Sequence, residues 1–161
     1  MQKSVIPNLE EFVHLPRFPD GRINYTGTKK APVLNCVVQY GEKVLLLKRS
    51  DKVANYKGIW NFVAGFIDEP RPIREKALEE VTEELGITEG DVSSTKTVEP
   101  YEIFDPTAQK TWIVYPALVV LNKQPKIKLD WEHSDYAWIS PDELNKYQVV
   151  YKLEETLKHL R

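Results

Sequence analysis

The sequence contains a single cysteine, Cys36, so a disulfide bond within the chain is excluded. Cys36 lies in the apolar stretch VLNCVV, where a small buried thiol is the ordinary interpretation. Chains without disulfides are typical of compartments that keep thiols reduced. The sequence therefore predicts a cytoplasmic protein.

An excess of charge of one sign is also absent, since 22 lysines and arginines stand against 24 aspartates and glutamates, for a net charge of −2. Without a basic excess there is no field to attract a nucleic-acid backbone or an anionic membrane, so we expect neither partner. Residues 1–14 lack the apolar core of a signal peptide, and no apolar run approaches the length of a membrane span.

What is present is the composition of a globular domain, with 42% hydrophobic and 29% charged residues, and we predict one domain over 1–161. Residues 1–31 form an N-terminal extension. It contains a Pro-Asp-Gly turn at 19–21 between short strand-like stretches, which predicts a hairpin. This extension either packs on the domain or forms a homodimer contact, and the sequence leaves both open.

Apolar patterning predicts a mixed sheet sandwiched between helices, in the α/β or α+β class. Strands are expected at 33–40, 43–48, 95–104, 111–121 and 136–139, with a short apolar piece at 59–64. The first two strands are almost continuously apolar, which indicates burial on both faces. Helices are expected at 72–85 and at 150–160. A further helix is expected to begin at Ser140-Pro141, where the serine can cap it and the proline fits its first turn.

The expected helix over 72–85 carries four carboxylates, at positions 79, 80, 83 and 84. At 3.6 residues per turn they share an arc of about 140°. Glutamates four positions apart repel each other by a few tenths of a kcal/mol per pair, so we expect a divalent cation to neutralise this face. Ala77, Leu78, Val81 and Leu85 form an apolar stripe roughly opposite, which predicts one core face and one acidic face.

The segment from Gly65 to Ile87 resembles the Nudix box, the signature of the Nudix hydrolases. The signature's conserved positions are matched by Gly65, Glu80, Val81, Glu83, Glu84, Gly86 and Ile87. The flanks resemble the family as well, over roughly 33–144. The resemblance implies a Nudix α/β/α sandwich, and Mg²⁺- or Mn²⁺-dependent hydrolysis of a nucleoside diphosphate linked to another moiety.

Two positions depart from the signature together. Its early glutamate is Arg71 here, and its arginine is Glu79. In the family these two side chains are understood to pair, so we predict a charge-exchanged Arg71–Glu79 pair. The alternative is that both are relics of lost catalysis, in a Nudix-like domain that binds nucleotide or metal as a sensor or scaffold.

The resemblance also implies roles for individual residues. The metal ligands carried over are Glu80, Glu83 and Glu84, joined by the Gly65 carbonyl. A general base is still needed, and it is either a ligand glutamate such as Glu83 or Glu84, or Glu132 in the loop before the last strand. His133 is expected to be a surface hydrogen-bonder instead. Arg49 and Lys57 are either phosphate contacts or solvated loop charges.

Other aromatic residues are open to two interpretations. Stacking on a nucleobase and packing on the sheet are both available to Tyr101, Phe104, Trp112 and Trp131, whereas Trp60 is expected in the core. A diphosphate isomerase on the same fold would need an acid or base such as a cysteine facing the substrate, and Cys36 in its apolar strand is a poor candidate. Substrates within the class are not distinguished by the sequence.

Overall fold

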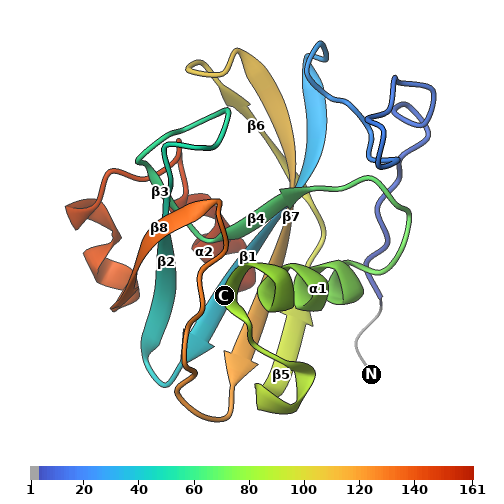
Figure 1. Cartoon of the computed structure of the whole chain (residues 1–161). Coiled ribbons are helices and arrows are strands. Elements are labelled where there is room, and N and C mark those ends of the chain that lie inside the picture. The colour runs from blue at the N-terminus through green and yellow to red at the C-terminus, as the bar shows by residue number, and fades with distance from the viewer. Residues whose placement is uncertain (1–3) are drawn as a thin grey trace.

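The structure, a computed structural model, describes residues 4–161. Within this range the chain forms one mixed sheet of eight strands flanked by helices (Figure 1). The strands are β1 (Lys30–Tyr40), β2 (Lys43–Arg49), β3 (Trp60–Asn61), β4 (Val63–Phe66), β5 (Val92–Thr97), β6 (Tyr101–Asp105), β7 (Lys110–Leu121) and β8 (His133–Ile139). The helices are α1 (Ile73–Leu85) and α2 (Glu154–Leu160), with 3₁₀ turns η1 (Glu89–Asp91) and η2 (Pro141–Lys146).

Strand β1 is the centre of the sheet. Along one edge it pairs in parallel with β7, from Lys30 opposite Thr111 to Gln39 opposite Val120. Its other edge is shared by two antiparallel strands, β2 near its end and β4 near its start. Strand β4 therefore runs beside the middle of the molecule immediately before the chain enters α1.

The two α-helices cover opposite faces of this sheet, as Figure 1 shows. Alternate residues of β1 belong to different cores, since Cys36 and Val38 pack with α1 whereas Val37 packs with Leu153 and Leu160 at the C-terminus. Burial on both faces explains the continuous apolar runs, and each buried Leu or Val contributes about 1.5–3 kcal/mol. The predicted α/β/α sandwich is confirmed.

Helix α1 has the predicted end and an unexpected start. Gly86 adopts the left-handed conformation at φ 74° and donates its N–H to the Thr82 carbonyl, which closes the last turn. Pro72 stands at the position before the first helical residue and makes no side-chain cap. Instead, the N–H of Ile73 donates to the carbonyl of Val5 at 2.8 Å. The N-terminal extension thus satisfies a backbone donor of α1.

The extension packs on the domain, which was one of the two expected arrangements. Leu9, Phe12, Ile23 and Tyr25 are buried in the core shared with α1. The hydroxyl of Tyr25 donates to the carbonyl of Ile67, in the loop between β4 and α1. The turn at 19–21 is present, but the flanking residues form a single antiparallel bridge instead of two strands.

Three expected elements differ in extent. The strand predicted over 95–104 is two strands, β5 and β6, because Pro100 lies in the break and has no N–H for a ladder bond. The helix that starts after Ser140 is the 3₁₀ turn η2, held by a capping box between Ser140 and Glu143. The last helix begins at Glu154 instead of residue 150. No helix in residues 4–161 is long and apolar enough to cross a membrane.

The bond from Tyr25 to Ile67 gives a test of how firmly the extension is attached. Tyr25→Phe leaves a buried carbonyl without its donor, so the free energy of unfolding in urea should fall by about 1–2 kcal/mol. Tyr40→Phe, at an exposed tyrosine, is the matched control and should change it by less than about 0.5 kcal/mol. Equal effects of the two substitutions would contradict the attachment.

Candidate active site

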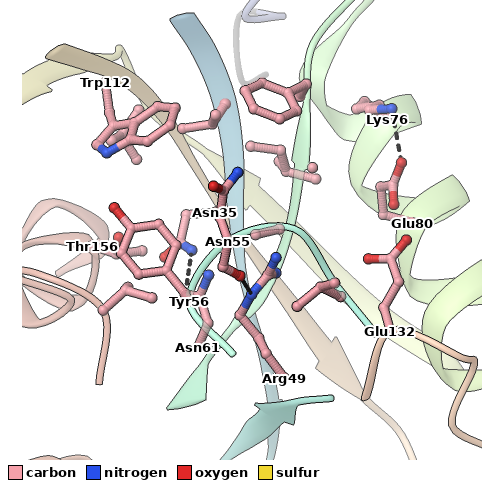
Figure 2. A pocket seen from close by; sticks show the side chains of 18 of the residues that line it. Asn35, Arg49, Asn55, Tyr56, Asn61, Lys76, Glu80, Trp112, Glu132 and Thr156 are labelled. Carbon is pink, nitrogen blue, oxygen red and sulfur yellow. Dashed lines mark hydrogen bonds and ion pairs between the residues drawn. The ribbon is translucent and has the colours of Figure 1, made fainter. Parts of the chain in front are cut away.

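A cavity of about 590 Å³ opens between α1, the middle of the sheet and the loops that precede β3 and β8. Figure 2 shows its two sides. Lys76, Glu80 and Glu132 lie on one side, and Trp112 and Tyr56 lie on the other, with Arg49 between them. The cavity therefore has an acidic end beside the helix and an aromatic end beside β6 and β7.

The acidic end is formed by consecutive turns of α1. Glu79, Glu80 and Glu83 each offer one carboxylate oxygen, and these oxygens lie within 4.8 Å of one another. All three residues line the cavity. Burial, then the negative charge of Glu80, raises the pKa of Glu83. Hard oxygen ligands at this spacing fit Mg²⁺ or Mn²⁺.

Glu84 belongs to the same helix but is buried, with 2% of its surface exposed. Neither of its carboxylate oxygens accepts a hydrogen bond from residues 4–161. Burial, together with Glu80, raises the pKa of Glu84 well above its usual range. A buried carboxylate without donors is costly, and a cation would relieve that cost. The donor set of α1 therefore fits a divalent cation.

His133 is a neighbour of Glu84, with its Nε2 at 3.5 Å from Glu84 Oε1. Its Nδ1 lies 3.0 Å from the carboxylate of Asp130. Burial lowers the pKa of His133 and the bond to Asp130 opposes that change. The expectation of a surface histidine was wrong, because the side chain is 2% exposed. The three-residue spacing from Asp130 was a signal for this hydrogen bond but not for the burial.

Gly65 lies on β4, directly beside Glu80. A Cβ atom at this position would lie 3.2 Å from Glu80 Cδ and 3.3 Å from its Oε1. A larger residue at this position would therefore displace the Glu80 carboxylate by a few tenths of an ångström. Whether the Gly65 carbonyl joins the ligands stays a prediction.

The charge-exchanged pair is present. A guanidinium nitrogen of Arg71 donates to Glu79 Oε2, and Arg71 Nε lies 4.0 Å from Glu69. The hydrogen bond to Glu79 raises the pKa of Arg71. The loop before α1 is thus tied to the helix with both charges reversed relative to the signature.

Lys76 was not singled out from the sequence. Its ammonium lies 2.8 Å from Glu80 Oε1, one turn further along α1, and the two side chains are 12% and 13% exposed. Burial opposes the charged form of Lys76, but the charge of Glu80 and the bond to it raise its pKa above the ordinary value. The four-residue spacing was the signal that could have identified this pair.

Glu132 and Arg49 lie outside the helix. Burial, then the negative charge of Asp130, raises the pKa of Glu132, while Arg49 opposes the change. Arg49 is partly buried, lines the cavity and donates from Nε to the Asn55 carbonyl at 3.0 Å. Lys57 is exposed and is not among the residues that line the cavity. The structure thus brings Glu132 and Arg49 to the site and leaves Lys57 apart.

The aromatic end is held by a buried carboxylate. Asp105 is 1% exposed and accepts hydrogen bonds from the Tyr56 hydroxyl and from Trp112 Nε1. Trp112, Tyr101 and Trp131 line the cavity, whereas Phe104 is exposed away from it. Trp60 is partly buried against the second core, as expected, in an edge contact with Tyr147.

The chain is similar in sequence to known proteins. A family model described as NUDIX domain matches residues 29–160. The nucleoside triphosphatase NudI of Escherichia coli O139:H28 is 25% identical over 129 residues, which cover 76% of this chain and 90% of that protein. A protein with the same name from Shigella flexneri gives the same values.

Solved structures resemble the chain in fold. The MutT protein of Methanosarcina mazei Go1 superposes with a TM-score of 0.66 at 20% identity, covering 83% of this chain and 94% of that one. An Ap4A hydrolase of C. elegans gives 0.61 at 20% identity, covering 80% and 93%.

The contact between Gly65 and Glu80 can be tested through Mn²⁺ binding. Gly65→Ala would push the Glu80 carboxylate away by a few tenths of an ångström, and the Mn²⁺ dissociation constant in calorimetry should rise about ten-fold. Gly27→Ala is the control, since a Cβ there meets no atom within 4 Å. Unchanged Mn²⁺ binding in a folded Gly65→Ala protein would contradict this account.

The Arg71–Glu79 pair can be tested by exchanging the charges. Arg71→Glu and Glu79→Arg each break the pair, and the double variant remakes it in the order of the Nudix signature. Because the side chains are 27% and 39% exposed, solvent screening limits the expected coupling in the free energy of unfolding to about 0.5–1 kcal/mol. Strictly additive effects would show that the two side chains do not act together.

Proposed function

Because the chain belongs to the Nudix hydrolase family, we propose that it hydrolyses the pyrophosphate bond of a nucleoside diphosphate linked to another moiety, with Mg²⁺ or Mn²⁺. The observation that carries the proposal is the acidic face of α1, which opens onto a cavity whose far end is aromatic. A polyanion with a planar group matches both ends of such a cavity.

The residues that would hold the cation are Glu80, Glu83 and Glu84, with the Gly65 carbonyl. A cation bound there would screen the charge of the pyrophosphate and stabilise the negative charge that develops as the bond breaks. Glu84 supports this assignment, because its buried oxygens accept no hydrogen bond from the described residues.

Glu132 is the general base we favour for the attacking water, and Glu83 and Glu84 are the alternatives. Glu132 points into the acidic end of the cavity from a loop, next to Glu80 in Figure 2. Its pKa is raised mainly by burial, and a carboxylate of higher pKa accepts a proton more readily. Water attack at phosphorus would then release a nucleoside monophosphate.

Arg49 would contact the substrate phosphates, and its support is that the guanidinium lies between the acidic and aromatic ends (Figure 2). Trp112 has its ring fixed by Asp105 and would offer a rigid apolar surface to the nucleobase or the linked group. Lys57 has less support as a phosphate contact, because it is exposed and lies outside the lining of the cavity.

Neither alternative function has an observation in its favour. The sensor hypothesis treated Arg71 and Glu79 as relics, but the two side chains are hydrogen-bonded to each other. An isomerase would need a cysteine at the substrate, and Cys36 is fully buried in the core, where burial raises its pKa. That free thiol supports a reducing compartment such as the cytoplasm.

The decisive experiment is a panel of nucleoside triphosphates, dinucleoside polyphosphates, nucleotide sugars, ADP-ribose and NADH, assayed with Mg²⁺ and Mn²⁺. We expect a nucleoside monophosphate among the products of at least one compound. Glu83→Gln and Glu84→Gln should each lower kcat by about 100-fold or more, because each removes a ligand charge. Glu132→Gln should lower it by about 100-fold if Glu132 is the base.

Glu154→Gln, at an exposed glutamate outside the cavity, is the control and should retain kcat. The assignment as a hydrolase of this class is wrong if no compound is turned over. It is equally wrong if the ligand variants remain fully active.

A further inference from the structure

Two positively charged side chains pair with the carboxylates at the acidic end of the cavity. Arg71 pairs with Glu79 and also lies near Glu69. Lys76 pairs with Glu80. Within residues 4–161, Lys76 is the one side chain that forms an ion pair with Glu80. Arg71 and Lys76 therefore form ion pairs with different carboxylates.

The Lys76–Glu80 pair is unlike the exposed ion pairs of the chain. Its nitrogen–oxygen distance is 2.8 Å and both side chains are almost nine-tenths buried, whereas Lys158 and Glu155 on α2, at 3.2 Å, are 61% and 30% exposed. Exposed pairs of that kind contribute little, while removing one partner of a buried pair leaves the other charge uncompensated.

Glu80 also lies close to the backbone of β4. A Cβ atom at Gly65 would be 3.2 Å from the carboxylate carbon, which is tighter than an ordinary van der Waals contact. The carboxylate thus has β4 close by, and the Lys76 ammonium binds its Oε1. Its orientation is therefore set by protein neighbours, since the Glu80 side chain is only 13% exposed.

We propose that Lys76 is the positioning residue for Glu80, and that it replaces the arginine that the Nudix signature has at position 79. The side chain at position 79 lies close to the Glu80 carboxylate, since an oxygen of Glu79 lies within 4.8 Å of oxygens of Glu80 and Glu83. An arginine there would place a cation beside Glu80. With glutamate at position 79, the cation beside Glu80 is Lys76, which lies one turn before Glu80 on α1.

The expected effect on kcat rests on the proposed function. The test introduces Lys76→Met into the natural chain and into the Arg71→Glu/Glu79→Arg double variant. Lys76→Met removes the charge at nearly constant length. In the natural chain, kcat should fall on the order of ten-fold or more, with a smaller change in KM. In the Arg71→Glu/Glu79→Arg background, the arginine introduced at position 79 takes over, so adding Lys76→Met should change kcat by less than about three-fold.

The second readout is the melting temperature without and with saturating Mn²⁺, which requires no turnover. Metal-free Lys76→Met should melt below the natural protein, because Glu80 then stands uncompensated among the other carboxylates. Mn²⁺ restores a positive charge, so it should raise the melting temperature more in Lys76→Met than in the natural chain. Lys158→Met, which breaks the exposed pair of α2, should leave the Mn²⁺ shift unchanged.

Each result bears on the proposal. A Lys76→Met loss that is equally large in both backgrounds overturns it, as does an Mn²⁺ shift equal to that of the natural chain. Lys76→Arg keeps the charge and should retain kcat within about three-fold. If Lys76→Met unfolds the natural chain, folding of the triple variant supports the proposal, and unfolding of both overturns it. An inactive natural protein would refute the proposed function, while the melting shifts would still decide the role of Lys76.

Discussion

Mutual repulsion of carboxylates on one helix is the constraint on which the rest of the site depends. Glu79, Glu80 and Glu83 meet within 4.8 Å, and Glu84 is buried behind them. Cations held close to these carboxylates reduce that repulsion. Arg71 and Lys76 each pair with one carboxylate, and the remaining negative charge is what the proposed divalent cation would neutralise.

The fold holds these groups together through the placement of one short strand. Strand β4 shares an edge of β1 with β2 and then leads into α1, so Gly65 lies against the helix at the level of Glu80. The parallel pairing of β1 with β7 brings Trp112 to the opposite side of the same cavity. Sheet topology thus fixes the distance between the two ends, and local sequence fixes the chemistry of each.

Much of this was predictable from the sequence, because the signals were local. The end of α1 and its apolar stripe follow from spacing within a few turns, and the Arg71–Glu79 pair followed from the resemblance to the Nudix box. The burial of His133 and the partner of Ile73 were not predictable, since each depends on a segment distant in sequence packing against α1. The break at Pro100 was a local signal that was missed when residues 95–104 were predicted as one strand.

The bond from Ile73 to Val5 has a consequence for where the domain can be divided. The family model begins at residue 29, yet a chain cut there would lose the acceptor for the first N–H of α1 and the core side chains Leu9, Phe12 and Tyr25. The N–H of Ile73, at the start of the helix that carries the acidic face, would then lack its acceptor. In this protein the hydrophobic core thus extends beyond the segment that the family model matches.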